Sequence, residues 1–322
     1  MHIVNQIKNP ALVTDNTLHV IGVVSNYAMF HSRYRLFREW YARMQATPNV
    51  KVYIVETALG DRQFECTEAG NPTQLQLRTN SEAWVKESMI NLGVRYLLPK
   101  DWKYMAWIDT DVEFENENWA QGTLHELQSH ALAQPWQQCI DLGPNGNIMQ
   151  TFQSFGWMHQ VGVQKQRTSK DPYQYCHSGF AWACRRSFFE ALPGKGLIDW
   201  MILGSADFNM AWGSIGDIVA TIYGTRAPSI ARRLKEWELA AVKQTSGHIG
   251  YVPGFIKHHF HGSKKKRFYE TRDQILYRCH FDPDHDLGYD EQGLIRIFNN
   301  PQLEEGIRKY NRLRAEDSID SV

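Results

Sequence analysis

The sequence predicts an α/β protein with a Rossmann-like, mostly parallel sheet flanked by helices. Along the first third of the chain, β-branched and apolar runs typical of buried strands alternate with segments whose apolar residues recur every three or four positions. Strands and helices that alternate in this way form parallel, doubly wound sheets. The chain has 322 residues, 43% of them hydrophobic, which is enough for one large domain with an appendage or for two modest domains.

The elements follow from local patterns. The first strand ends at Asn26, apolar residues between Phe30 and Met44 then follow the helical period, and Gly93 is expected to end a second helix. The expected elements are, in chain order, strand 18–25, helix 30–44, strand 51–56, helix 82–92, strand 104–108, helix 119–130, strand 180–184, helix 187–192, helix 229–243 and extended chain 250–260. Residues 136–176 show little periodicity and are expected to form short strands and a mobile loop of the kind that covers functional sites.

Composition excludes several classes of protein. The formal net charge is zero, so no global basic field draws the chain to nucleic acid. The five cysteines contain no Cys-x-x-Cys pair, which argues against a zinc ribbon or a disulfide framework. The first strand is followed by neither a Gly-x-Gly-x-x-Gly motif nor a phosphate loop, which argues against a dinucleotide-dependent dehydrogenase and a phosphate-loop kinase. The start of the chain does not resemble a signal peptide and no run is long enough to span a bilayer, so we expect a cytoplasmic protein without a membrane partner (in the host cytoplasm if the chain is viral).

Two carboxylates follow the strand at 104–108. Asp109 and Asp111 are one residue apart, at the carboxyl end where ligands bind in open α/β sheets. Carboxylate oxygens are the ligands that Mg²⁺ and Mn²⁺ prefer, and these ions commonly bridge to substrate phosphates. The alternative is a pair of solvated turn carboxylates.

Two later motifs add to this pair. Asp207 closes the segment Gly204-Ser-Ala-Asp207 at the start of a helix, where it could act as a general base or as a helix cap. The run 258–267 holds three histidines, a glycine and four consecutive basic residues. One of these histidines could complete a metal site, and the basic residues could neutralise a departing diphosphate or form a solvated face.

These motifs, in this order, resemble the glycosyltransferases of the GT-A fold, and most closely a branch common in bacteriophage and bacterial genomes. The residues that carry the resemblance lie at 104–111, 177–186, 204–207 and 258–272. The resemblance implies a GT-A domain at 17–265, with a nucleotide-binding half at 17–115 and an acceptor half at 116–265. A helical extension would follow at 266–322.

The resemblance also implies roles for individual residues. Asp111 would bind Mn²⁺ or Mg²⁺, and Asp109 would contact the metal or the ribose. His261 would be the third protein ligand, with His259 as a competing candidate. Asp207 would be the catalytic base of an inverting enzyme. The remaining candidates would hold the diphosphate or line the pocket for the nucleoside, sugar or acceptor: Val23, Ser25, Asn26, Glu56, Arg78, Lys86, Asn91, Gly179, Trp182, Lys264, Lys265 and Arg267.

Several of these residues have structural alternatives. Glu56 could cap a loop, Trp182 could pack in the core, and His258 could point into the core. Two rival functions also stay open: a nucleotide-sugar binding module without catalysis, and a metal-dependent phosphohydrolase.

The resemblance implies a nucleotide-sugar donor, by default a UDP-sugar, and a hexosyl or pentosyl transfer. The likeness to bacteriophage proteins suggests a 5-hydroxymethylpyrimidine in DNA as the acceptor. The neutral net charge counts against DNA, and a glycan or a protein hydroxyl is the alternative.

Overall fold

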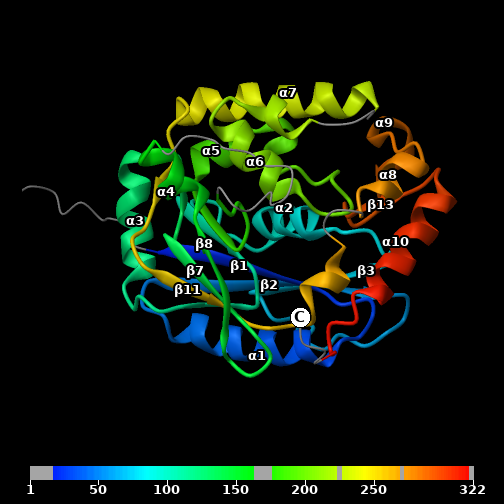
Figure 1. Ribbon diagram of the computed structural model, residues 1–322, viewed down its shortest axis with the longest axis horizontal. Helices are drawn as coiled ribbons and strands as arrows, with labels where there is room; N and C mark the ends of the chain where they lie inside the picture. Colours follow the sequence, from blue (N-terminus) through cyan, green and yellow to red (C-terminus); the bar gives the residue numbers. More distant parts are fainter. Residues whose placement is uncertain (1–16, 163–175, 223–226, 269–271, 319–322) are drawn as a thin grey trace, which may run out of the picture.

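A central sheet organises the molecule, in a computed structural model that describes residues 17–162, 176–222, 227–268 and 272–318 (Figure 1). Its strands are β1 (Leu18–Ser25), β2 (Val50–Leu59), β3 (Gln74–Thr79), β4 (Tyr104–Ile108), β6 (Leu132–Gln134), β9 (Ala181–Arg185) and β10 (Gly250–Tyr251). They lie in the order β10-β6-β9-β4-β1-β2-β3, and only the pairings made by β9 are antiparallel. The predicted mostly parallel α/β sheet is confirmed, with the carboxyl ends of β1, β2 and β4 at one edge.

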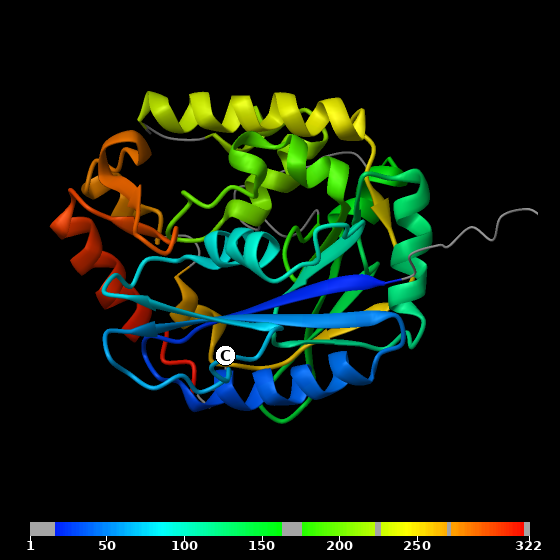
Figure 2. The ribbon, with the colours of Figure 1, turned by 180° about the vertical axis from the view of Figure 1, so that it is seen from behind.

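Helices cover both faces of this sheet (Figure 2). One face packs against α1 (His31–Ala46) and α3 (Trp119–Ser129), whose buried side chains share a core with β1 and β2. The other face packs against α2 (Lys86–Tyr96), α4 (Phe155–Gln160), α5 (Arg186–Ala191), α6 (Ala206–Ser214) and α7 (Pro228–Thr245). Every strand and helix expected from the sequence is present, with ends shifted by a few residues.

The second helix differs from its prediction. It begins at Lys86 instead of residue 82, and it continues through Gly93 to Tyr96. A Cβ at Gly93 would lie 3.0 Å from Val55 and 3.2 Å from Ile21. The glycine therefore lets α2 lie close against the sheet. Its role is in packing, and it does not end the helix.

Strand β3 was missed because its sequence lacks an apolar run. It is an edge strand that pairs only with β2 within the described sheet, and most of its side chains are partly exposed. Polar residues are common on such edges because they discourage pairing with another chain.

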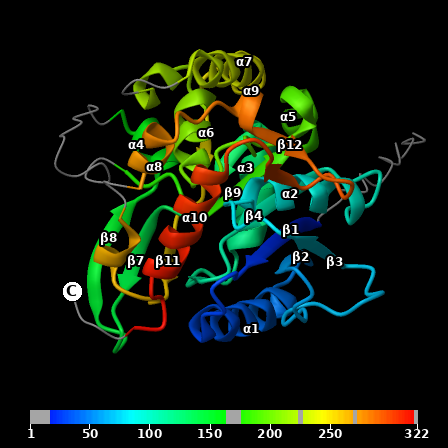
Figure 3. The same cartoon turned by 90° about the vertical axis from the view of Figure 1, so that its right-hand side faces the viewer.

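A second sheet lies beside the carboxyl edge of the first, at the left in Figure 3. It contains β5 (Val112–Phe114), β11 (Phe255–His258), β7 (Gln138–Leu142) and β8 (Ile148–Gln153), in the order β5-β11-β7-β8. The short strands expected after residue 136 are confirmed. The loop expected there falls partly on residues 163–175, which lie outside the described residues.

The C-terminal part packs beside the sheet and returns to the start of α1. It contains η3 (Lys264–Arg267), α8 (Gln274–Arg278), α9 (Pro283–Asp286), the hairpin β12 (Leu287–Tyr289) and β13 (Ile295–Ile297), and α10 (Pro301–Leu313). Leu303, Ile307 and Tyr310 form the buried stripe of α10. No helix in the described part of the chain is both long enough and apolar enough to cross a bilayer. The other short helices are η1 (Pro193–Lys195) and η2 (Ile218–Thr221).

Candidate active site

A cavity of about 390 Å³ opens at the carboxyl ends of β1 and β4. This is the edge at which open α/β sheets bind their ligands. The structure brings together in its wall ten of the residues predicted from the sequence: Val23, Ser25, Lys86, Asp109, Asp111, Gly179, Asp207, His261, Lys264 and Arg267.

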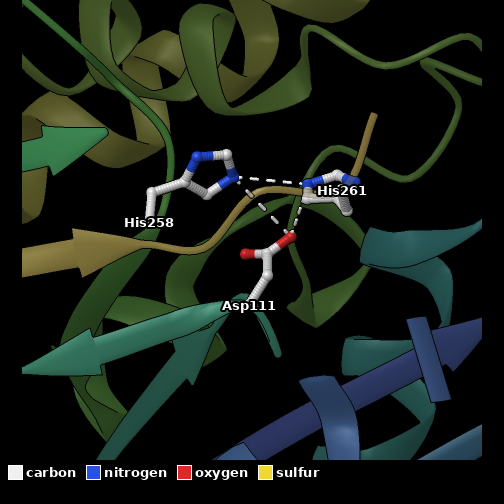
Figure 4. Close-up of side chains that lie close together, drawn as sticks. All are labelled: Asp111, His258 and His261. Carbon is white, nitrogen blue, oxygen red and sulfur yellow. Dashed lines mark hydrogen bonds and ion pairs between the residues drawn. The ribbon is translucent and has the colours of Figure 1, made fainter. Parts of the chain in front are cut away.

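The pairing of β5 with β11 joins the Asp-x-Asp turn to the histidine turn. Asp111 directly precedes β5, and His258 ends β11 opposite Val112. The main chain of His259 also donates to the carbonyl of Asp111 at 2.9 Å. Strands far apart in the sequence therefore place the carboxylate of Asp111 beside the rings of His258 and His261 (Figure 4).

Three ligand atoms face one another in this cluster. Oδ2 of Asp111 lies 3.0 Å from Nε2 of His261 and 3.8 Å from Nε2 of His258, and the two Nε2 atoms are 3.3 Å apart. Among the described residues, Oδ1 of Asp111 is buried without a hydrogen-bond partner. A carboxylate with a buried, unbonded oxygen and two imidazoles is a suitable donor set for a divalent cation.

The other nitrogen of each ring is held by a further carboxylate. Nδ1 of His258 lies 2.6 Å from Asp141, and Nδ1 of His261 lies 3.2 Å from Glu316. If each Nδ1 carries the proton that it donates to its carboxylate, both Nε2 lone pairs face Asp111. Acceptor atoms this close repel one another unless positive charge lies among them, and a metal ion bound between them would supply it, beside the guanidinium of Arg267.

Burial acts to raise the pKa of Asp111, but His258 and His261 in their protonated forms, together with Arg267, hold it well below its usual range. Asp111 is therefore ionised near neutral pH, as a metal ligand must be.

The structure places His259 outside this cluster, whereas the sequence left it as a ligand candidate. Consecutive residues of an extended chain point to opposite sides, so His259 turns away from His258. Its Nε2 lies 2.8 Å from Glu113. His258, for which core packing was the alternative, lies in the cluster instead.

We expect His258→Ala to abolish Mn²⁺ binding and His259→Ala to leave it close to that of wild type. The reason is that only the first removes an atom of the three-atom cluster. Electron paramagnetic resonance detects free Mn²⁺, so a titration followed by this method measures the Mn²⁺ affinity of both variants. Equal losses in the two variants would contradict this assignment.

Asp109, the other predicted carboxylate, forms an ion pair with Lys86. Burial raises the pKa of Asp109, and the adjacent ammonium opposes that rise. The ion pair holds Asp109 at the cavity wall but outside the three-atom cluster, so Asp111 alone of the two enters it.

Asp207 lies in the first turn of α6, on the cavity wall. Its Oδ1 accepts the main-chain N–H of Phe208 at 2.9 Å. A Cβ added at Gly179 would lie 2.7 Å from Oδ2, so the glycine leaves room for that oxygen. Ser205, just before the helix, has a φ of 73°, which is a strained conformation for a residue other than glycine.

Glu87 was not predicted but lines the same wall. It is 4% exposed. Burial raises its pKa to about 8, with smaller contributions from Lys86, which lowers it, and from Asp207 and Asp109, which raise it. Its sequence context, inside an amphipathic helix, gave no signal, because only the fold reveals that this carboxyl is enclosed.

The raised pKa makes stability depend on pH. Between its ordinary pKa of 4.5 and about 8, the folded state keeps a proton on Glu87 that the unfolded chain releases, so the free energy of unfolding falls as the pH rises through this window. Glu87→Gln stays neutral, and we expect its stability relative to wild type to increase by on the order of 1 kcal/mol between pH 7 and pH 9.

Urea unfolding at several pH values measures this difference, with the exposed Glu117→Gln as the control. A constant difference between Glu87→Gln and wild type would show that Glu87 is ionised in the folded protein at neutral pH.

Positive side chains gather near the histidine cluster. Arg267 lies with Nη2 3.0 Å from Nε2 of His261, and Lys264 pairs with Asp141 and donates to Gln150 at 2.9 Å. Lys265 is exposed and does not line the cavity. Three arginines that the sequence did not single out as site residues also line it: Arg33, Arg272 and Arg314.

Two predicted pocket residues instead hold loops. Glu56 is buried and accepts the main-chain N–H groups of Glu65 and Cys66 at 2.8 and 3.0 Å, which is the loop-capping role left open as its alternative. Asn26 accepts the N–H of Phe30 at 2.9 Å and fixes the turn into α1.

Three more of the predicted pocket residues lie away from the cavity. Arg78 donates to the carbonyl of Gly60 at 2.8 Å. The side chain of Asn91 donates a hydrogen bond to the main-chain carbonyl of Leu197 and accepts one from its main-chain N–H. Trp182 is a core residue, 3% exposed, which is the core-packing role left open as its alternative.

Comparison with known proteins gives distant likenesses in structure. No protein-family model and no curated protein matches the chain. S. aureus TarS matches with a TM-score of 0.41 and 10% identity, over 84% of this chain and 68% of the other. The catalytic domain of Drosophila β1,4-galactosyltransferase 7, in complex with xylobiose, matches with a TM-score of 0.41 and 12% identity, over 90% and 98%. A mutant of that enzyme, in complex with manganese, UDP-Gal and xylobiose, matches with a TM-score of 0.39 and 11% identity, over 90% and 98%.

Proposed function

We propose that the chain is a metal-dependent glycosyltransferase of the GT-A type, which moves a sugar from a nucleoside-diphosphate donor to an acceptor hydroxyl. The observation that carries the proposal is the cluster of Asp111, His258 and His261, which shares one cavity with Asp207 and several arginines. A cation site, a carboxylate base and positive side chains are the groups that this transfer needs.

The donor set favours Mn²⁺ over Mg²⁺. Imidazole nitrogen suits transition metals, whereas Mg²⁺ prefers oxygen ligands alone. When bound, the cation would offset negative charge on the diphosphate leaving group. Asp141 and Glu316 hold the two histidine rings in place for it.

Asp207 would act as the base of an inverting transfer. Its Oδ2 would take the proton of the acceptor hydroxyl as that oxygen bonds to the anomeric carbon and the bond from that carbon to the diphosphate breaks. Arg267 and Lys264 would stabilise the negative charge that develops on the diphosphate. Val23 and Ser25, at the carboxyl end of β1, would line the nucleoside end of the cavity.

An acceptor panel tests the proposal. The protein is incubated with Mn²⁺, a UDP-sugar (glucose, galactose, arabinose or N-acetylhexosamine) and one acceptor at a time: an oligosaccharide, a hydroxyl-rich peptide or DNA containing 5-hydroxymethylpyrimidines. We expect one acceptor to gain the mass of one sugar while UDP is released in equal amount. Release of UMP and a sugar phosphate, the products of cleaving the diphosphate itself, would instead support the phosphohydrolase, and donor binding without any cleavage would support the inactive binding module.

A further inference from the structure

The metal cluster is supported from the far end of the chain. Glu316 lies beyond α10 and is 1% exposed, yet its Oε2 is 3.2 Å from Nδ1 of His261. We call residues 314–317 the C-terminal strap. Figure 1 shows this segment, in red, running from α10 toward the start of α1.

The strap is fastened to the N-terminus of α1. Asp317 accepts the main-chain N–H groups of His31 and Ser32 at 2.8 and 2.7 Å. The residue that precedes α1 is Phe30, whose side chain cannot accept these bonds, so a carboxylate from the other end of the chain caps the helix. Ser32 also donates its hydroxyl to the main-chain carbonyl of Glu316 at 3.2 Å.

The strap also fits closely against the histidine turn. Gly262 has a φ of 89°, and a Cβ added there would lie 2.7 Å from the Cα of Glu316. A side chain at this position would displace the strap. The turn that carries His261 therefore contacts the strap through its main chain as well as through the ring.

One carboxylate orients three groups of the site. Glu316 accepts from Arg33 Nη2 at 2.8 Å and from Arg314 Nε at 2.5 Å, in addition to its contact with His261. Both arginines line the cavity. When the strap is displaced, His261 loses the partner of its Nδ1, and Arg33 loses the carboxylate that orients it.

We propose that Glu316 is a positioning residue that holds His261 for the cation, so that seating of the C-terminal strap and binding of the divalent cation favour each other. This rests on the proposed function, because it requires the cluster of Asp111, His258 and His261 to be a metal site. The coupling is reciprocal: a strap that strengthens cation binding is itself held more tightly once the cation is bound.

Mn²⁺ titrations followed by electron paramagnetic resonance test the first half of the proposal. We expect Glu316→Ala to bind Mn²⁺ about 10- to 100-fold more weakly than wild type, the usual effect of losing a carboxylate behind a metal-bound histidine. Glu316→Gln should bind between the two, because an amide oxygen can still accept from Nδ1. Glu305→Gln, an exposed change on α10, is the matched control and should bind as wild type does.

Hydrogen exchange of the wild-type strap tests the second half without changing Glu316. We expect the peptide that contains residues 314–318 to exchange more slowly with Mn²⁺ than without, and Mn²⁺ to have no effect on it in Asp111→Ala. Wild-type affinity in Glu316→Ala, or strap exchange that Mn²⁺ does not change in a protein that binds it, would overturn this proposal alone. A wild-type protein that binds no Mn²⁺ would overturn the metal site, and with it the proposed function.

Discussion

Asp111→Ala is expected to abolish Mn²⁺ binding and, with it, Mn²⁺-dependent binding of the nucleotide. The variant removes the only carboxylate of the three-atom cluster and leaves two imidazoles. Loss of a carboxylate that only supports a metal-bound histidine already costs about 10- to 100-fold in affinity, so losing the ligand itself should cost more than ~100-fold. Calorimetric titration with Mn²⁺ measures the loss.

The matched control for this variant is Glu113→Gln. Glu113 is two residues along the same chain segment but faces His259 and Arg43, away from the cluster. We expect this variant to bind Mn²⁺ as wild type does. If both variants lost the metal, a general disturbance of the β5–β11 pairing would explain the result better than loss of a ligand.

Asp207→Asn should have the second large effect, on turnover rather than on binding. An amide keeps the size of the side chain and can still accept from Phe208, but it cannot take a proton from the acceptor. A general base contributes roughly 10²- to 10⁴-fold to a rate, so we expect kcat to fall by about a thousandfold.

Affinity for the donor with Mn²⁺ separates this role from a structural one. It should stay close to that of wild type in Asp207→Asn, because the side chain is not part of the cation cluster. Asp101→Asn, an exposed change outside the cavity, is the control for the charge alone. A variant that transferred sugar at the wild-type rate would leave Asp207 as an ordinary residue of the first turn of α6.

The fold could be predicted where the periodicity of apolar residues was strong. The run 18–25 and the spacing from Phe30 to Met44 correctly predicted β1 and α1, because both bury a continuous apolar surface. The same patterns failed for β3, whose edge position needs no apolar run. They also misjudged Gly93, since a glycine that ends a helix and one that packs against a sheet look alike in one dimension.

The candidate site could be predicted in part, for a physical reason. Asp109 and Asp111 follow a strand, and strand ends meet at one edge of a parallel sheet. Choosing between His258 and His259 required the register of β11 against β5, which the sequence does not reveal. Glu316 could not be found at all, because its contact with His261 spans 55 positions of the chain and has no local pattern.

The most direct test of the central claim is a calorimetric titration of the wild-type protein with UDP, carried out with and without Mn²⁺. The proposed donor site predicts clear binding with Mn²⁺ and a large loss of affinity without it, because the cation cluster lies in the same cavity as Arg267 and Lys264, which would hold the diphosphate. UDP affinity that is the same in both titrations, or no binding of UDP when Mn²⁺ is present, would contradict a metal-dependent glycosyltransferase.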